Sequence, residues 1–313
     1  MLPRARPAKP EGSRDTVRML IKVVLIVVAV QVLLPLLILI GRDRMIFVPP
    51  NAPPPEAGLR ALRGLADVEL VSVQRSDGRE LAAYDARPKD PTPLSETPHD
   101  VPTVVFFHGN GGTITWMADL AEDLVAETGM RWFFAEYSGY GGNAGVPSEA
   151  EVRRDALAVW DHLTTAGTPP EKIFLYGESL GGAVAIYLAS ERQVGGLVLQ
   201  STFSSISSMA GRLFPWLPLA SVASRGIFPN DQLIADLECP ILMIHGTADS
   251  IVPYAEGERL RQAAPAHAEF MTLEGVDHND VFLRGGPEYM RGIGEKIRGF
   301  SDPQVGDPQV GDP

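Results

Sequence analysis

A serine between glycines, the G-x-S-x-G run at 177–181, is the chemical motif that stands out in this sequence. It follows the apolar stretch 173–176 and precedes a helical pattern, which is the strand–turn–helix context that this motif requires. Such a turn strains the backbone of the serine, and glycines beside it remove Cβ atoms that would clash. The hydroxyl then projects near the positively polarised N-terminus of a helix. We predict that Ser179 is a nucleophile.

A serine hydroxyl is a weak nucleophile until a base takes its proton. With this motif the chain order is serine, acid, histidine, so the base lies downstream of Ser179. His245 closes a predicted strand, which favours a structural role, and His267 lies between a helix and a strand, which favours the surface. His278 follows the last predicted strand in a loop, and we predict that it is the general base.

An acid must orient the imidazole and stabilise its charged form. Asp249 comes a few residues after the strand that precedes the last one. Asp277 and Asp280 adjoin His278, but close neighbours in one loop seldom present their carboxylates to the ring, and turn formation explains them. We therefore predict that Asp249 is the acid.

The oxyanion of a tetrahedral intermediate needs hydrogen-bond donors. The expected donors are the backbone N–H groups of Leu180, directly after the nucleophile, and of Asn110, in the glycine-rich run at 107–112. The same glycines could cradle a phosphate, but no Gly-Lys-Ser/Thr completes a P-loop.

Short apolar runs alternate with helical patterns between about residues 65 and 300. A hairpin is expected at 68–86, further strands at 103–107, 132–136, 172–176, 196–200, 241–244 and 269–273, and helices at 114–127, 148–165, 180–191, 254–263 and 287–299. This alternation predicts an α/β protein with a mostly parallel central sheet and helices on both faces. Ligands of such sheets bind beyond the carboxyl ends of the strands, where the candidate residues fall.

The ordered set of motifs resembles the α/β-hydrolase superfamily, and within it the membrane-anchored group of fungal bud-emergence-like hydrolases and animal α/β-hydrolase-domain lipid hydrolases. The motifs are His108-Gly109-Asn110-Gly111-Gly112, Gly139-Tyr140-Gly141, Gly177-Glu178-Ser179-Leu180-Gly181-Gly182, Ser201-Thr202-Phe203, His245-Gly246-Thr247-Ala248-Asp249 with Val252-Pro253, and His278-Asn279-Asp280. The resemblance covers roughly 65–300 and implies the α/β-hydrolase fold.

The same resemblance implies a serine hydrolase of esters or thioesters, with lysophospholipids, monoacylglycerols and acylated proteins among the substrate types of the group. Ser179, Asp249 and His278 fall on its triad positions, and Asn110 and Leu180 on its oxyanion positions. The chain departs from the group at 143, where asparagine replaces the common serine in a loop that shapes the pocket rim.

Between 201 and 240 the sequence is rich in large apolar side chains and too short for a large helical cap. We expect a short lid after the sixth strand that offers an apolar acyl pocket or a patch facing the bilayer. Closure of the domain core is an equal alternative. The candidate substrate-binding residues are Phe203, Leu213, Phe214 and Trp216.

The run 20–40 is long and apolar enough to cross a bilayer, since 17 of its 21 residues are Leu, Ile or Val. A cleaved signal peptide would have a shorter apolar region and a small-residue cleavage site, and a buried core helix would be shorter and more amphipathic. We predict a signal anchor at 19–41. The basic residues before it place the N-terminus in the cytoplasm and export the catalytic domain to the periplasm or a lumen. They are Arg4, Arg6, Lys9, Arg14 and Arg18.

The predicted organisation has five parts. They are a basic tail at 1–18, the transmembrane anchor at 19–41, a proline-rich linker at 42–64, the catalytic domain at 65–300 and a disordered repeat tail at 301–313.

Composition excludes some functions. Lys+Arg 27 against Asp+Glu 39 gives a net charge of −12, which argues against a nucleic-acid partner. A single cysteine, Cys239, excludes an internal disulfide, and no Cys/His cluster predicts a metal, so we expect neither metal nor cofactor. The leading hypothesis is a membrane-tethered hydrolase of small-molecule or lipid esters. An acyltransferase with the same residues, or a non-catalytic hydrolase-fold tether, are the alternatives.

Overall fold

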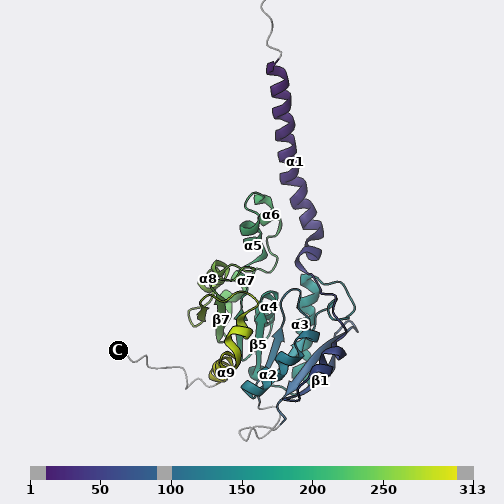
Figure 1. The fold of residues 1–313 in the computed structure, drawn as a ribbon, viewed down its shortest axis with the longest axis vertical. Helices are drawn as coiled ribbons and strands as arrows, with labels where there is room; N and C mark the ends of the chain where they lie inside the picture. Colours follow the sequence, from purple (N-terminus) through teal and green to yellow (C-terminus); the bar gives the residue numbers. More distant parts are fainter. Residues whose placement is uncertain (1–11, 90–100, 302–313) are drawn as a thin grey trace, which may run out of the picture.

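An eight-stranded sheet forms the centre of the computed structural model, which describes residues 12–89 and 101–301 (Figure 1). The strands are β1 (Asp67–Gln74), β2 (Glu80–Arg87), β3 (Thr103–Phe107), β4 (Arg131–Ala135), β5 (Ile173–Glu178), β6 (Gly196–Gln200), β7 (Ile241–Gly246) and β8 (Glu269–Leu273). Their order is β1-β2-β4-β3-β5-β6-β7-β8. The β1–β2 and β2–β4 pairs are antiparallel and the others are parallel. The carboxyl ends of the parallel strands therefore share one edge.

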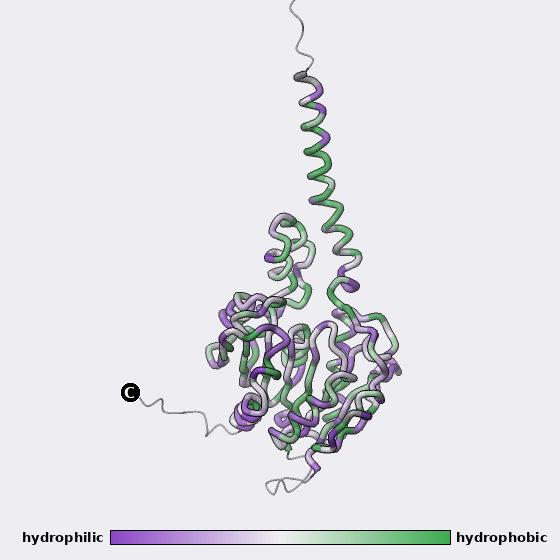
Figure 2. Tube along the Cα trace, viewed as in Figure 1, coloured by the Kyte–Doolittle hydropathy of each residue, from purple (hydrophilic) through white to green (hydrophobic). Residues whose placement is uncertain are grey.

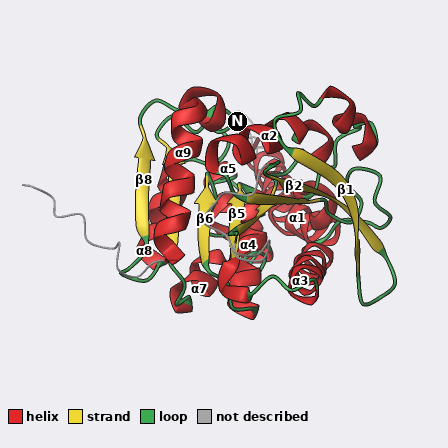
Figure 3. Cartoon of the chain, turned by 90° about the horizontal axis from the view of Figure 1, so that it is seen from below, coloured by secondary structure: helices red, strands yellow, loops and turns green. Residues whose placement is uncertain are grey.

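Helices cover both faces of this sheet (Figure 3). One face carries α2 (Ala118–Thr128) and α9 (Val281–Ser301), and the other carries α3 (Glu149–Thr165), α4 (Leu180–Glu191) and α8 (Tyr254–Ala263). In β3, Val104 and Phe106 join the core beneath α2 and α9, while Val105 and Phe107 join the core beneath α3 and α4. Burial on both faces explains the continuous apolar runs, and the predicted α/β-hydrolase fold is confirmed.

Two helices begin at places different from those predicted. The stretch expected to be helical from 114 starts as a 3-10 turn, η2 (Ile114–Trp116), and α2 begins at Ala118. The last helix, α9, begins at Val281 with a short segment that was not predicted, and the predicted helix 287–299 follows a break at Gly286, whose φ of +54° and ψ of −155° are non-helical. Glycine tolerates this left-handed conformation, and Pro287 after it cannot donate the backbone hydrogen bond that would continue the helix.

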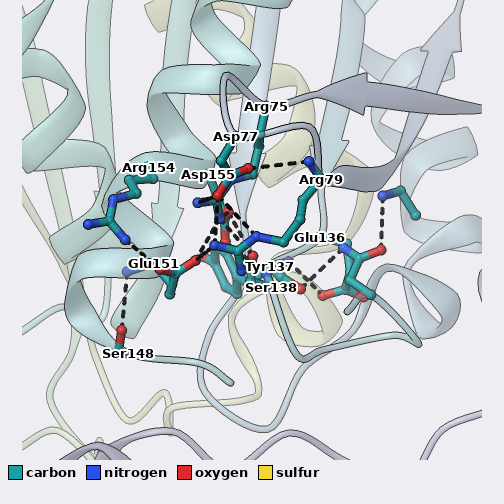
Figure 4. A network of polar contacts seen from close by, with 12 residues as sticks. Arg75, Asp77, Arg79, Glu136, Tyr137, Ser138, Ser148, Glu151, Arg154 and Asp155 are labelled. Carbon is teal, nitrogen blue, oxygen red and sulfur yellow. Dashed lines mark hydrogen bonds and ion pairs between the residues drawn. The ribbon is translucent and has the colours of Figure 1, made fainter. Parts of the chain in front are cut away.

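A buried arginine fastens the β1–β2 hairpin to the domain (Figure 4). Arg75 precedes the turn, and its Nη1 lies 2.5 Å from Asp155 and 2.8 Å from Glu151, both on α3. The same nitrogen donates to the Ser138 hydroxyl in the loop after β4. The hairpin at the edge of the sheet is thereby tied to α3 and to the loop that follows the carboxyl end of β4.

The short helix η3 (Pro170–Lys172) precedes β5 at the amino ends of the parallel strands.

The helix α1 (Gly12–Ile46) runs away from the domain and is apolar over most of its length (Figures 1 and 2). Its segment Asp15–Leu37 is long and apolar enough to cross a membrane, and most of it is exposed. The predicted anchor 19–41 lies within α1. Residues 42–46, expected in the linker, end this helix, and η1 (Pro55–Ala61) follows. Of the predicted tails at 1–18 and 301–313, residues 12–18 begin α1 and Ser301 ends α9, and residues 1–11 and 302–313 lie outside the described residues.

The lid, defined here as residues 205–227, stands off the sheet beside α1 (Figure 1). It contains α5 (Ile206–Leu213) and α6 (Pro218–Ala223), and its two ends meet where the N–H of Ile206 donates to the oxygen of Ile227. After it, α7 (Asn230–Leu233) and η4 (Ile234–Asp236) lead back to β7. A short lid follows β6, as expected.

Candidate active site

Ser179 occupies the sharp turn between β5 and α4. Its φ of +53° and ψ of −114° are unusual for a residue with a side chain, and such strain persists only where the surrounding structure holds it. A Cβ at Gly177 would lie 2.5 Å from the oxygen of Gly181, and one at Gly181 would lie 1.9 Å from the oxygen of Phe107. Only glycine fits at either position, so the G-x-S-x-G pattern follows directly from the closeness of these backbones.

A carboxylate and an imidazole meet beside this turn. The Oδ2 atom of Asp249, after β7, lies 2.7 Å from Nδ1 of His278, in the loop after β8. Its Oδ1 atom accepts the backbone N–H groups of Val252 and Ile251 at 2.7 and 3.0 Å. Burial opposes ionisation, but the contacts with His245, His278 and Val252 hold the pKa of Asp249 well below its ordinary value. An ionised Asp249 can accept a hydrogen bond from a protonated Nδ1 of His278. In that tautomer Nε2 of the ring carries a lone pair.

The other downstream histidines have different partners. Nε2 of His245 lies 2.9 Å from the oxygen of Val252 and 3.4 Å from Asp249 Oδ2, inside the domain. Nε2 of His267 lies 3.0 Å from the oxygen of Cys239. Both contacts are consistent with structural roles.

Asp277 orders the loop that carries His278. Its Oδ1 accepts the backbone N–H groups of Ser250 and His278 at 2.8 and 2.7 Å. This carboxylate therefore ties the loop after β8 to the loop after β7, and the imidazole meets Asp249 instead.

A cavity of about 310 Å³ opens at Ser179, and we call it the serine cavity. The residues that line it are Arg42, Met45, Ile46, Asn110, Ser179, Leu180, Phe203, Ile206, Met209, Ala210, Leu213, Phe214, Ala220, Ala223, Ser224, Ile227, Ile251 and Val252. Its volume is at the small end of the range for ligand pockets, and its wall is largely apolar.

The sequence-predicted residues distribute unevenly around this cavity. Ser179, Asn110 and Leu180 line it together, as do Phe203, Leu213 and Phe214, whereas Trp216 does not. Neither Asp249 nor His278 lines it. Ile251 and Val252 do line it, and their N–H groups bind the carboxylate of Asp249, which is thereby attached to this part of the wall.

Among the described residues, no hydrogen bond joins the Ser179 hydroxyl to His278. Catalytic hydrogen bonds are often long without substrate and tighten only when it binds.

The end of α1 contributes residues that sequence reasoning missed. Arg42, Met45 and Ile46 line the serine cavity. The side chain of Asn110 accepts the backbone N–H of Val48 at 2.9 Å and donates to the oxygen of Ile46 at 2.6 Å. No local pattern signals a contact between segments more than sixty residues apart, and only the glycine-rich run marks the loop.

A buried ion pair supports the loop that carries Asn110. Nε2 of His108 lies 2.7 Å from Oε1 of Glu136, and both side chains are fully buried. Burial disfavours both charges, but the attraction between them raises the pKa of His108 and lowers that of Glu136. Glu136 also accepts the N–H of Ile114 at 3.0 Å, so this pair holds both ends of the 108–114 loop.

Glu178, directly before the serine, is a half-buried acid. Burial raises its pKa, and the charges of His278 and His108 offset this only in part. No cluster of three or more His, Cys, Asp or Glu side chains that could hold a metal occurs in the part of the chain that the structure describes. The arrangement is therefore a hydroxyl at a helix N-terminus, a carboxylate–imidazole pair and an apolar cavity.

Comparison with known families gives one match, to the Hydrolase_4 family, described as serine aminopeptidase S33, over residues 98–234. The matched range includes Ser179 and ends before Asp249 and His278. It is consistent with a hydrolase of the α/β fold.

Similar proteins occur in bacteria and animals. The uncharacterized protein Rv2307c of Mycobacterium tuberculosis is 34% identical over 248 residues, which are 78% of this chain and 82% of that protein. The α/β-hydrolase domain-containing proteins aho-3 of Caenorhabditis elegans and 17C of Xenopus tropicalis are 31% and 32% identical. Those matches cover 68% and 58% of this chain, and 61% and 57% of the respective relatives.

Solved structures share the fold. The putative hydrolase from Agrobacterium vitis S4 superposes with a TM-score of 0.56 at 24% identity, covering 76% of this chain and 99% of that one. The esterase Pf2001 of Pyrococcus furiosus gives 0.60 at 18% identity, covering 82% and 98%.

Proposed function

This chain belongs to the α/β-hydrolase superfamily, and we propose that it is a membrane-tethered serine hydrolase that cleaves carboxylic esters, lipid esters or thioesters included, through an acyl-enzyme. Ser179 is the nucleophile, His278 the general base and Asp249 the acid that orients it. The backbone N–H groups of Asn110 and Leu180 receive the oxyanion.

The observation that carries this proposal is the position of Ser179. Its strained turn places the residue at the start of α4, on the wall of an apolar cavity that Asn110 and Leu180 also line. Asp249, whose carboxylate is bound by the N–H groups of Ile251 and Val252 of that wall, lies 2.7 Å from the imidazole of His278, which supports the assignment of acid and base. A hydroxyl, a base with an acid behind it and two amide donors beside an apolar space are the parts that acyl transfer needs.

The reaction proceeds in two halves. Ser179 Oγ attacks the carbonyl carbon of the ester while Nε2 of His278 takes the hydroxyl proton. The ester C–O bond breaks, His278 returns the proton to the departing alcohol, and the acyl group stays on Ser179. Water then attacks the acyl-enzyme, His278 takes a proton from it and gives that proton to Ser179 Oγ as the carboxylic acid leaves. Asp249 keeps the imidazole in the productive tautomer throughout.

The tether is the anchor at 19–41 within α1. The Asp15–Leu37 segment has the length and hydropathy of a membrane span, which supports this part of the proposal. The excess of basic residues before it supports a cytoplasmic N-terminus and an exported catalytic domain.

Two measurements on the full chain in detergent test the function. A fluorophosphonate probe should label the wild-type protein and leave Ser179→Ala unlabelled. Hydrolysis of p-nitrophenyl esters from acetate to palmitate should depend on Ser179 at every chain length. Labelling that persists in Ser179→Ala would assign the nucleophile elsewhere, and an absence of hydrolysis across the whole series would contradict an esterase.

A further inference from the structure

The lid and α1 form one apolar unit that continues into the serine cavity. We propose that the outer part of this unit is embedded in the bilayer leaflet, and that the substrate is a lipid ester whose acyl chain passes sideways from that leaflet, between α1 and the lid, to Ser179. This inference rests on the proposed esterase function and names the substrate class and its route.

The first observation is the contact between α1 and the lid. Nε2 of Gln31 donates to the backbone oxygen of Trp216 at 2.9 Å. Gln31, Leu34 and Pro35 are the partly or fully buried positions of this part of α1, and their i, i+3, i+4 spacing puts them on one helix face. The neighbouring positions Val32, Leu33 and Leu36 are exposed. One face of an otherwise unpartnered apolar helix therefore packs on the lid.

The second observation is depth. Gln31 lies six residues before Leu37, where the segment able to span a membrane ends. At a rise of 1.5 Å per residue the lid reaches about 9 Å along that segment. Amphipathic helices at an interface bury their apolar faces about 5–10 Å into the headgroup and acyl boundary. A membrane that surrounds α1 at this segment must also surround the tip of the lid.

The third observation is the chemistry of the lid. Apart from Arg212 and Arg225, its exposed large side chains are all apolar, and Trp is a residue enriched at membrane interfaces. They are Leu213, Phe214, Trp216, Leu219 and Val222. Residues 205–227 contain no acidic side chain, although the whole chain carries −12. Of its two arginines, Arg212 in the last turn of α5 pairs with Glu256 of α8 at 2.7 Å, and Arg225 lies near the C-terminal end of the lid. An exposed surface that is largely apolar and carries no acidic side chain matches a leaflet of phospholipids.

The fourth observation is continuity with the site. In α6, Ala220 and Ala223 line the serine cavity, while Leu219 and Val222 lie outside it and are 40% and 48% exposed. Met45 and Ile46 of α1 line the same cavity, so both α1 and the lid contribute to its walls. An acyl chain that slides between these walls stays in apolar surroundings from the leaflet to Ser179.

The activity test compares two substrates on the full chain in phosphatidylcholine–phosphatidylglycerol vesicles. Leu219→Asp and Val222→Asp place a charge on the outer face of the lid and leave the cavity lining unchanged. We expect them to lower hydrolysis of a long-chain monoacylglycerol in the vesicles about tenfold, because a carboxylate opposes insertion. Hydrolysis of water-soluble p-nitrophenyl butyrate should stay within about twofold of wild type.

The control variant is Leu283→Asp on α9, which adds the same charge at a side chain that is 81% exposed. It should change neither rate. Equal rates of the lid variants and wild type on the vesicle substrate would overturn the inference, as would an equal loss on both substrates. A wild-type chain inactive on butyrate would instead contradict the proposed function.

Depth is measured independently of activity. In a Cys239→Ser background, Leu219→Cys carries a bimane label, with Glu191→Cys, exposed at the end of α4, as the control. Phosphatidylcholine with a spin label near the headgroup end of its chain should quench the label at 219 and not that at 191, and aqueous iodide should do the reverse. Quenching of the 219 label by iodide alone would place the lid in water. Protection from both quenchers would mean that another polypeptide covers it. Either result overturns the inference.

Discussion

Asp249 holds His278 with a single carboxylate oxygen, Oδ2, which lies 2.7 Å from Nδ1 of the imidazole. The other oxygen is occupied by two backbone N–H groups of the loop after β7. The same Oδ2 lies 3.4 Å from Nε2 of His245. The backbone of the loop after β7 thus fixes Oδ1 of the carboxylate. Oδ2 remains to accept a hydrogen bond from the imidazole that would serve as base.

Asp249→Asn should lower kcat by about 10⁴, because an amide can stabilise the wrong tautomer of His278. The pKa of Asp249 is held below its ordinary 3.8, so the wild-type carboxylate contributes stability above that pH and loses it as the pH falls through the folded-state value. The stability difference between wild type and Asp249→Asn should therefore shrink in acid. Steady-state ester hydrolysis and thermal unfolding at several pH values measure both effects. An unchanged kcat would assign the acid role to another residue.

Substitution of the two histidines near Asp249, His278 and His245, should have different effects on activity and stability. His278→Gln should lower kcat about 10³-fold or more, because the general base is gone. His245→Gln should lower the melting temperature, because its contact with Val252 is buried, while kcat of the folded protein stays within about tenfold. If His245→Gln abolished turnover in a folded protein, His245 would take part in the chemistry.

The strained backbone at Ser179 lowers stability in order to place the nucleophile, so replacement of the serine should reveal the cost of that strain. Ser179→Ala and Ser179→Gly should both lose ester hydrolysis. The glycine variant should be more stable than the alanine variant by about 1 kcal/mol, because glycine adopts the positive φ of +53° without a Cβ penalty. Chemical denaturation of the two variants measures the difference. Equal stabilities would show that the turn holds little strain.

Glu178→Gln tests the half-buried acid beside Ser179. Burial raises the pKa of Glu178 above its ordinary 4.5, so its neutral form is favoured in the fold. Its contribution to stability is fully present below pH 4.5 and is lost as the pH rises through the folded-state value. The melting temperature of Glu178→Gln relative to wild type should therefore increase from pH 4 to neutral pH. A constant difference across this range would contradict a raised pKa.

Arg212→Met should loosen the lid. Arg212 on α5 donates to Glu256, which also accepts the hydroxyls of Ser204 and Ser208. Loss of this charge-assisted contact should raise the open population of the lid by up to about tenfold, reduced by solvent because Arg212 is 37% exposed. Chymotryptic cleavage after Trp216 should accelerate accordingly. Arg225→Met at the other end of the lid is the control, and equal acceleration there would remove the special role of the Glu256 contact.

The sequence predicted the sheet well because its information was local. Each buried strand is a short apolar run between turns, and G-x-S-x-G needs a strand before it and a helix after it. The helix predicted from 287 matches the second part of α9, because Gly286 and Pro287 do mark a helix boundary. The short helical segment from Val281 before it was not predicted, and Val281 and Met290 pack into the core on both sides of the break.

The walls of the site could not be predicted in the same way. Trp216 was expected in the pocket because it is large and apolar, but it does not line the serine cavity. Its backbone oxygen accepts a hydrogen bond from Gln31, and its side chain is 58% exposed. The small residues Ala220 and Ala223 line the cavity instead. The spacing of apolar residues along the sequence does not tell which distant helix the lid will contact. The contribution of α1 to the cavity wall is therefore visible only in the structure.

The attachment of Asn110 to Ile46 and Val48 has a practical consequence for anyone who shortens the chain to obtain a water-soluble fragment. Trimming after Val48, at the start of the proline-rich stretch, removes Met45 and Ile46 and releases the side chain of Asn110 from both of its backbone partners. Such a fragment would retain every reactive group and still lack one side of its binding site. Poor turnover by a trimmed protein would then report the missing wall rather than the chemistry.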